Sequence, residues 1–164
     1  MFLSRSVFSQ VVSNTPLVSI DLCVFREKEI LLGKRNNPPA KNYFFVPGGR
    51  ILKSETKGSA FERILKNELG MALKKNQHKN IKNLGIYEHF YEDNFLDNKN
   101  FSTHYVVIAF LVPYKSLINI QKFSLEEQHS QYIWQNIKNI KKSSYKIHKY
   151  TIEYFKNPFF QYLI

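Results

Sequence analysis

The sequence lacks the features that mark secreted and membrane proteins. Cys23 is its only cysteine, so no disulfide can form within the chain, which fits a reducing compartment. No stretch stays apolar for the roughly 20 residues that a membrane-spanning helix needs. The first residues show no charged start followed by a long apolar run, as a signal peptide would. We therefore expect a cytoplasmic protein without a membrane partner.

Acidic residues are also scarce. The chain contains 13 Asp and Glu against 24 Lys and Arg, which gives a net charge of +11. A charge of this sign favours polyanions, because their counterions are released on binding. The lysines, however, lie scattered among asparagines and isoleucines, as in residues 136–142, which is typical of a general bias in residue usage. We therefore expect no nucleic-acid partner, although the same positive field would attract a nucleotide diphosphate.

The length of the chain predicts one domain. A chain of 164 residues can bury one sizeable core and is too short for two ordinary domains. The sequence contains no internal repeat and no linker rich in proline or glycine. We therefore expect residues 1–164 to form a single domain.

Alternating apolar residues predict several strands separated by turns. In residues 17–25, apolar side chains occupy every second position, which indicates a strand with one face in the core. Residues 29–35 return beside it as a hairpin, and residues 84–95 and 103–112 are aromatic and β-branched runs that we expect to pair antiparallel. The remaining predicted strands are residues 43–46 and 132–134.

Two amphipathic helices accompany these strands. The first follows Ser54 and Glu55, whose side chains can cap a helix, and it ends at Gly70, a residue typical of helix C-termini. Its apolar stripe consists of Phe61, Ile64, Leu65 and Leu69. The second is predicted from the spacing of Ile147, Tyr150, Thr151 and Tyr154. Together these elements indicate the α+β (mixed) class, with a mixed β-sheet flanked by helices.

Residues 47–70 carry the clearest chemical signal. Gly48 and Gly49 allow a turn whose backbone groups are not covered by side chains. The residues that follow at the spacing of a known motif are Glu55, Arg63, Glu68 and Gly70. This pattern resembles the Nudix box, a loop–helix–loop that holds a divalent metal against a diphosphate through the carboxylate and carbonyl oxygens that Mg²⁺ prefers. The resemblance implies the Nudix fold, an α/β/α sandwich built on a mixed sheet.

The box departs from the family pattern at two acidic positions. Where the pattern has glutamate, this chain has Ile64 and Asn67, so Glu68 alone remains of the acidic cluster on the helix. Fewer carboxylates should hold fewer metals, and we expect one Mg²⁺ per subunit, which Mn²⁺ could replace. We expect Glu55 to orient the loop or cap the helix, and Arg63 to pair with Glu55 or brace the loop.

Further stretches resemble one Nudix subfamily, the GDP-mannose mannosyl hydrolases, which has this reduced box. The matching stretches are residues 1–3, 15–19, 31–35, 45–50, 60–63, 68–70, 89–91, 93–95, 103–107 and 127–129. The resemblance implies a hydrolase of GDP-mannose, with some tolerance for GDP-glucose. In that subfamily water attacks the anomeric carbon of the sugar, and GDP and mannose are released with inversion. Such a role is consistent with polysaccharide biosynthesis.

The resemblance also implies roles for individual residues. The implied metal ligands are the carbonyl of Gly49 and the side chains of Glu68 and Gln128. His129 would deprotonate the attacking water, as suits a side chain that titrates near neutrality. The other implied catalytic residues are Arg35 and Arg50 as clamps on the diphosphate, Tyr105 as a further donor, and Asp21 and His89 near the mannose.

The N-terminal match implies a binding site for the guanine base. Phe2, Leu3 and Phe8 are expected near guanine, with Phe8 stacking on it. Several members of the subfamily pair through this segment, so we expect a homodimer in which residues 1–14 are swapped and the base pocket is shared. Residues 156–164 are apolar and have no counterpart in the resemblance, so we expect them to pack on the domain or at a dimer contact.

Two alternatives stay open at this point. One is ordinary Nudix pyrophosphohydrolysis of a nucleotide sugar, which gives GMP and a sugar phosphate. The glutamates missing at Ile64 and Asn67 count against it. The other is a non-catalytic nucleotide-sugar-binding protein or an RNA-binding Nudix relative. The presence of Gln128 and His129 beside Glu68 argues against this second alternative. His104 neighbours Tyr105 on an alternating strand and therefore points the opposite way, as a structural residue would.

Overall fold

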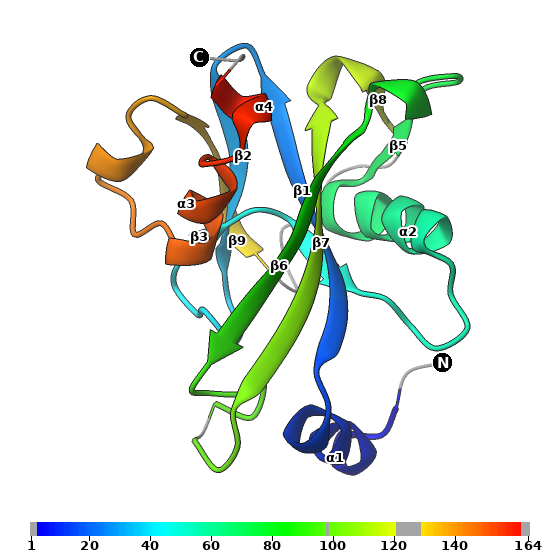
Figure 1. Ribbon diagram of the computed structural model, residues 1–164, viewed down its shortest axis with the longest axis vertical. Coiled ribbons are helices and arrows are strands. Elements are labelled where there is room, and N and C mark those ends of the chain that lie inside the picture. The colour runs from blue at the N-terminus through cyan, green and yellow to red at the C-terminus, as the bar shows by residue number, and fades with distance from the viewer. Residues whose placement is uncertain (1–2, 98, 121–128, 162–164) are drawn as a thin grey trace.

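A mixed seven-stranded sheet forms the centre of the protein (Figure 1). The computed structural model describes residues 3–97, 99–120 and 130–160, and the backbone of His129 and Gln161. The strands of this sheet are β1 (Leu17–Arg26), β2 (Glu29–Arg35), β3 (Phe44–Phe45), β4 (Gly48–Arg50), β6 (Lys82–Tyr91), β7 (Thr103–Pro113) and β9 (His129–Asn136). The main path runs β3-β2-β1-β7-β6, with β4 paired to β1 and β9 paired to β2. Only the β1–β7 pair among them is parallel.

Helices cover both faces of this sheet, as the sequence predicts. The helix α2 lies on one side, while α3 and α4 lie on the other (Figure 1). The helices are α1 (Arg5–Asn14), α2 (Lys57–Leu69), α3 (Lys149–Tyr154) and α4 (Pro158–Gln161), with short 3-10 turns at His78–Asn80, Tyr114–Ser116 and Ile140–Lys142. A separate two-stranded sheet joins β5 (Met71–Leu73) to β8 (Leu117–Asn119). None of the helices in the described ranges has the length and apolar composition needed to cross a membrane.

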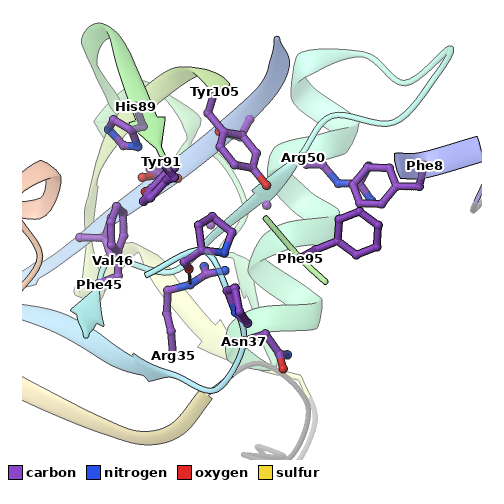
Figure 2. A pocket seen from close by; sticks show the side chains of 16 residues that line it. Phe8, Arg35, Asn37, Phe45, Val46, Arg50, His89, Tyr91, Phe95 and Tyr105 are labelled. Atoms are coloured by element: carbon purple, nitrogen blue, oxygen red, sulfur yellow. Dashed lines mark hydrogen bonds between the residues drawn. The ribbon is translucent and has the colours of Figure 1, made fainter. Parts of the chain in front are cut away.

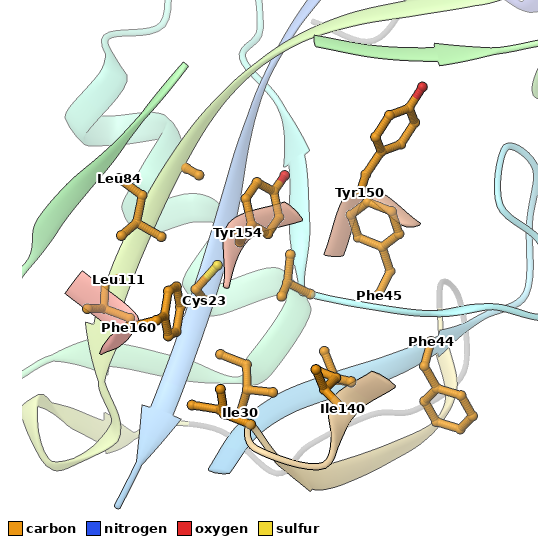
Figure 3. Close-up of a cluster of buried hydrophobic side chains, with 14 of the residues drawn as sticks. Cys23, Ile30, Phe44, Phe45, Leu84, Leu111, Ile140, Tyr150, Tyr154 and Phe160 are labelled. Atoms are coloured by element: carbon orange, nitrogen blue, oxygen red, sulfur yellow. The ribbon is translucent and has the colours of Figure 1, made fainter. Parts of the chain in front are cut away.

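The strand β1 is buried on both faces, which corrects the expectation of a single core face. Its residues Ile20, Leu22 and Val24 pack under α2, as the alternation predicts. The intervening Cys23 belongs to a second hydrophobic cluster beneath α3 and α4, shown in Figure 3. Because a strand between two layers has no solvent face, the polar residue at position 21 is buried as well.

The C-terminal residues complete the second cluster. Tyr150, Thr151 and Tyr154 of α3 are buried, in agreement with the predicted amphipathic spacing. Phe160 of α4 is completely buried near Cys23 (Figure 3), so this part of the apolar tail packs on the domain, one of the two expected outcomes. Residues 162–164 lie outside the described residues.

The same segment also covers the outer edge of β6. The hydroxyl of Tyr150 accepts a hydrogen bond from the Phe90 amide at 2.7 Å and donates one to the Phe90 carbonyl at 2.8 Å. The side-chain amide of Asn157 donates to the carbonyl of Leu84 at 2.6 Å. An open strand edge is a template for pairing with another chain, so these side chains occupy groups that would otherwise remain available.

Several element boundaries differ from the prediction. The strand predicted to reach Phe95 ends at Tyr91, because Asp93 and Asn94 hold a loop: Asp93 accepts from the Thr103 hydroxyl and Asn94 from the Leu96 amide. The strand predicted at residues 132–134 is extended by pairing with β2 and covers eight residues. The helices α1 and α4 and the strands β5 and β8 were not predicted, since they are short or only weakly apolar on one face.

The N-cap of α2 is Thr56, which corrects the prediction of Ser54 and Glu55. The Thr56 hydroxyl accepts from the Ser59 amide at 3.1 Å. Ser54 instead adopts a positive φ of 65° in the preceding loop. At the other end Gly70 terminates the helix in the left-handed conformation, as predicted.

Replacing Thr56 by alanine should lower the free energy of unfolding by about 1 kcal/mol, because the amide of Ser59 loses its acceptor. The measurement is urea unfolding followed by circular dichroism. Ser54→Ala is the matched control and should change stability by less than about 0.5 kcal/mol, since its hydroxyl does not cap the helix. Equal losses in the two variants would contradict the assignment of the cap.

Candidate active site

One cavity of about 380 Å³ collects most of the residues that the sequence analysis singled out (Figure 2). The predicted site residues in its lining are Phe8, Asp21, Arg35, Gly49, Arg50, His89 and Tyr105. Leu3 and Glu68 are described but are not part of the lining, and Leu3 is exposed. Phe2 and Gln128 lie outside the described residues, and for His129 only the backbone is described.

The cavity has two ends of different chemistry. Figure 2 shows His89, Tyr91 and Phe45 on one side, and Phe8 and Phe95 on the opposite side. Asp21 belongs to the first end, because the Tyr154 hydroxyl links its carboxylate to His89. The cavity therefore combines an aromatic end containing a carboxylate with a second aromatic end beside Arg50.

Glycine at position 48 creates the space for the Asp21 carboxylate. Asp21 and Gly48 are paired residues of β1 and β4. A Cβ atom at Gly48 would overlap the Oδ1 atom of Asp21 and the carbonyl oxygen of Ile20. The two glycines form a strand and not the predicted turn, yet the predicted reason for glycine holds, since a side chain at Gly48 would intrude on the site.

The Asp21 carboxylate is almost completely buried. Its Oδ2 atom accepts a hydrogen bond of 2.6 Å from the hydroxyl of Tyr154 on α3. Burial raises the pKa of Asp21 from 3.8 to about 7, although the Tyr154 hydroxyl and the charge of Arg35 both oppose that shift. The fold thus stabilises the negative charge of Asp21 only in part. A positively charged group in the cavity would stabilise it further.

His89 lies directly beside this pair. Its Nε2 atom is 3.2 Å from the Tyr154 hydroxyl, and its ring stacks on Tyr150 at 4.1 Å with an interplanar angle of 8°. Burial, and to a lesser extent His148, lowers the pKa of His89 to about 3. His89 is therefore neutral at physiological pH and acts as a hydrogen-bonding group, not as a cation.

Arg35 ends β2 and is held by backbone atoms. Its Nε donates to the carbonyl of Pro39 at 2.9 Å, and its own amide donates to Tyr43. The backbone of His129 pairs with Arg35 across β2 and β9, just after a register shift. The predicted general base is thus attached, through the sheet, next to one of the predicted phosphate-binding arginines.

Arg50 lies against Phe8 at the other end of the cavity. Its guanidinium is 3.9 Å from the Phe8 ring centroid, and Phe8 packs on Phe95 with centroids 4.6 Å apart. Burial lowers the pKa of Arg50, whereas the nearby Tyr105 opposes the shift. Phe8 belongs to α1, which is capped by the hydroxyl of Ser4 and packs beside β7.

Arg63 and Glu55 brace the loop that carries Arg50. Arg63 donates to the two carboxylate oxygens of Glu55 at 2.7 and 2.8 Å and to the Arg50 carbonyl at 2.7 Å. The Arg63 hydrogen bonds lower the pKa of Glu55 to about 2. This two-pronged geometry confirms the predicted pairing and fixes the backbone of Arg50 to α2.

Gly49 of β4 lies beside the face of α2 that carries Ile64 and Glu68. The Cα of Gly49 packs on Ile64, and Glu68 follows Ile64 by one helical turn. Burial raises the pKa of Glu68 to about 7, with Arg35 and Arg63 opposing the shift. A carboxylate destabilised in this way gains from a nearby cation, so Glu68 and the Gly49 carbonyl fit a hard divalent ion. The described residues contain no cluster of three or more acidic, His or Cys side chains for a metal.

Sequence reasoning missed Tyr91, Phe45 and the site role of Tyr154. The first two belong to apolar strands and to stretches that match the subfamily, but they received no site role because they could not be told from core residues. Tyr154 was identified as a buried residue of the C-terminal helix. A usable signal existed, because a buried tyrosine needs a hydrogen-bond partner and Asp21 is a carboxylate in a core strand.

Comparison with known proteins gives several matches. A family model described as "NUDIX domain" matches residues 15–155. The low-salt glycan biosynthesis protein Agl8 of Haloferax volcanii is 37% identical over 121 residues, which cover 74% of this chain and 71% of that protein. The ADP-ribose pyrophosphatase of Methanocaldococcus jannaschii is 39% identical over 56 residues, only 34% of this chain and 33% of that protein.

Solved structures share the fold at lower identity. A MutT NUDIX hydrolase of Burkholderia pseudomallei has a TM-score of 0.64 at 19% identity, over 88% of this chain and 98% of its own. The NUDIX domain of Shewanella oneidensis NrtR, solved with ADP ribose, has a TM-score of 0.61 at 13% identity, over 98% of this chain and 99% of its own. Likeness at these identities shows the fold alone.

The Asp21→Asn variant should lose part of the pH dependence of stability. A carboxyl whose pKa is raised from 3.8 to about 7 binds its proton more tightly in the folded state. Its contribution to the free energy of unfolding is therefore present at low pH and is lost as the pH rises towards 7. Between pH 5 and pH 8, the wild-type free energy of unfolding should fall by about 2–3 kcal/mol more than that of the variant. Urea unfolding in a chelating buffer measures the difference, and parallel pH profiles would contradict it.

Proposed function

This chain belongs to the Nudix hydrolase family, and we propose that it hydrolyses GDP-mannose to GDP and mannose, with some tolerance for GDP-glucose. Water would attack the anomeric carbon of the sugar, with inversion. The observation that carries the proposal is the content of the cavity: Arg35 and Arg50 provide positive charge, and Asp21 provides one buried carboxylate. This combination suits a diphosphate attached to a group that becomes positively charged in the transition state.

The two arginines suit the diphosphate. In the described residues neither Arg35 nor Arg50 forms an ion pair with a carboxylate, whereas Arg63 is paired with Glu55. Both guanidiniums are therefore electrostatically available to phosphate oxygens. The charge that develops on the departing diphosphate would be stabilised by groups already in place, which is the main source of catalysis in such reactions.

The aromatic end suits the sugar. Cleavage at the anomeric carbon develops positive charge on the sugar ring, and the Asp21 carboxylate would stabilise it. Neutral His89 and Tyr105 would provide hydrogen bonds to the sugar and the diphosphate. The flat faces of Tyr91 and Phe45 also line this end, so a hexose would contact both apolar and polar groups.

The small number of acidic side chains on α2 favours attack by water at the anomeric carbon over attack at phosphorus. Ile64 occupies a position that is acidic in the usual box, and its side chain is buried against Gly49. The two positions Ile64 and Asn67 therefore contribute no metal ligand of the usual kind. Ordinary pyrophosphohydrolysis, which gives GMP and a sugar phosphate, remains the alternative that product analysis decides.

Nudix hydrolases generally use a divalent metal such as Mg²⁺ or Mn²⁺. In this chain the Gly49 carbonyl and Glu68 would hold one such ion, together with Gln128 from outside the described residues. When bound, the ion would supply positive charge for the departing diphosphate. Ile64 supports the arrangement by packing Gly49 on the face of α2 that carries Glu68.

The remaining roles concern the attacking water and the base. His129 would act as general base, and its backbone position beside Arg35 is compatible with that role. Phe8 would stack on guanine, with Leu3 and Phe2 nearby, and Phe95 extends this aromatic surface. We also propose a homodimer formed through residues 1–14 in which the base pocket is shared.

The biological setting follows from the relative with the longest sequence match described above. Its printed name places Agl8 in low-salt glycan biosynthesis. Glycan biosynthesis consumes activated sugars, so an enzyme that hydrolyses one of them would control its supply. We propose a role of this kind in the cytoplasm, with a small-molecule nucleotide sugar as substrate and no nucleic acid as partner.

Hydrolysis in ¹⁸O-labelled water tests the proposed reaction directly. With Mg²⁺ and GDP-mannose, the label should appear in the free mannose, because water attacks the anomeric carbon. Mass spectrometry of both products reads out the position of the label. Label in GMP or in the sugar phosphate would establish pyrophosphohydrolysis instead, and binding of GDP-mannose without any product would favour the non-catalytic alternative.

The His129→Gln variant should bind GDP-mannose almost as tightly as the wild type, while kcat falls by a factor of about 10²–10⁴, the usual share of a general base. Initial rates and calorimetric titration provide the two measurements. His78→Gln is the matched control, because His78 is an exposed residue remote from the cavity lining, and its kcat should be unchanged. An unchanged kcat in His129→Gln would remove His129 from the mechanism.

A further inference from the structure

We propose that Tyr154 is a positioning residue for the sugar end of the cavity: its hydroxyl holds one oxygen of the Asp21 carboxylate so that the other oxygen faces the sugar. This inference rests on the proposed function for the assignment of the sugar to Asp21. Tyr154 itself is completely buried and does not belong to the cavity lining, so it would act on the substrate only through Asp21.

The two oxygens of Asp21 have different surroundings. The Oδ2 atom accepts the 2.6 Å hydrogen bond from Tyr154. The Oδ1 atom lies against Gly48, at the place that a Cβ atom would fill. Both Asp21 and Gly48 line the cavity, and the Tyr154 hydroxyl already occupies Oδ2, so Oδ1 is the oxygen left for a ligand in the cavity. The glycine and the tyrosine therefore act on opposite oxygens of one carboxylate.

The Tyr154 hydroxyl is itself fixed by His89. With Asp21 ionised, the Tyr154 proton is donated to Oδ2, so the 3.2 Å contact with His89 requires the imidazole Nε2–H to donate to the Tyr154 oxygen. The stack of His89 on Tyr150 limits the rotation of the imidazole ring. The chain of donors thus runs from His89 through Tyr154 to Asp21.

The Tyr154 ring is also held from the side. Tyr87 packs edge-on against it, with ring centroids 4.7 Å apart and an interplanar angle of 89°. The ring therefore has little freedom, and its hydroxyl has a defined position. A phenylalanine would keep this packing but leave Oδ2 of Asp21 without a donor, so that the carboxylate could rotate. The hydroxyl, not the ring, is what the site requires of position 154.

The test is Tyr154→Phe, assayed with GDP-mannose and Mg²⁺. We expect kcat to fall about 10- to 100-fold, because the charge-stabilising oxygen is misplaced in the transition state. The affinity for GDP, which lacks the sugar, should stay within about threefold of the wild type. Tyr87→Phe is the matched control: it removes a neighbouring, partly buried hydroxyl that donates to Leu84 and not to Asp21, and should leave kcat unchanged.

A double-mutant cycle separates positioning from a general loss of structure. In the Asp21→Asn background, Tyr154→Phe should lower kcat by less than about threefold, because the carboxylate through which Tyr154 acts is gone. The same fold-loss in both backgrounds would overturn the proposal, as would an unchanged kcat in Tyr154→Phe alone. Circular dichroism and GDP titration establish that each variant is folded.

Failure of the proposed function can be distinguished from failure of this inference. If the wild type hydrolyses a different nucleotide sugar, or at phosphorus, the proposed function fails and the cycle is run with that reaction. If no turnover occurs, the wild-type preference for GDP-mannose over GDP is measured by calorimetry. Tyr154→Phe should then reduce that preference only when Asp21 is present, and an unchanged preference would overturn the role of Tyr154.

Discussion

The burial of the Asp21 carboxylate constrains the elements around it. A charged group in a strand covered on both faces is costly to bury without partners. The fold provides a hydroxyl from Tyr154, a slot against Gly48 and the field of Arg35. These come from α3, β4 and the end of β2, so the site depends on parts of the chain far apart in sequence. The remaining destabilisation of the charge is what a cationic transition state would relieve.

The three arginines at the site differ in whether a carboxylate neutralises their charge. Arg63 is neutralised by Glu55 and also donates to the Arg50 carbonyl, so its charge stabilises the conformation of this segment. Arg35 and Arg50 are held instead by a carbonyl and by an aromatic ring, neither of which removes their net charge. A clamp for an anion needs this second kind of support, because a guanidinium already paired with a carboxylate attracts phosphate less.

The parts of the fold and of the site that depend on local sequence patterns could be predicted from the sequence. The stripe of α2, its end at Gly70 and the Arg63–Glu55 pair all depend on spacing along one helix. The predicted cap was wrong because Ser54 and Thr56 carry similar hydroxyls, and the backbone conformation of the loop selects Thr56. The second buried face of β1 could not be predicted either, since α3 and α4 cover it from more than 100 residues away.

The helix α3 contributes both to the stability of the sheet and to the geometry of the site. Tyr150 covers the open edge of β6, and Tyr154, one turn later, reaches the Asp21 carboxylate. His89 contacts both tyrosines, stacking on one and hydrogen bonding to the other. One short helix thus contacts the edge strand, the imidazole and the carboxylate together, so the end of the cavity that contains Asp21 depends on the docking of α3. The apolar tail residue Phe160 reinforces that docking, which gives this otherwise unmatched segment a reason to be apolar.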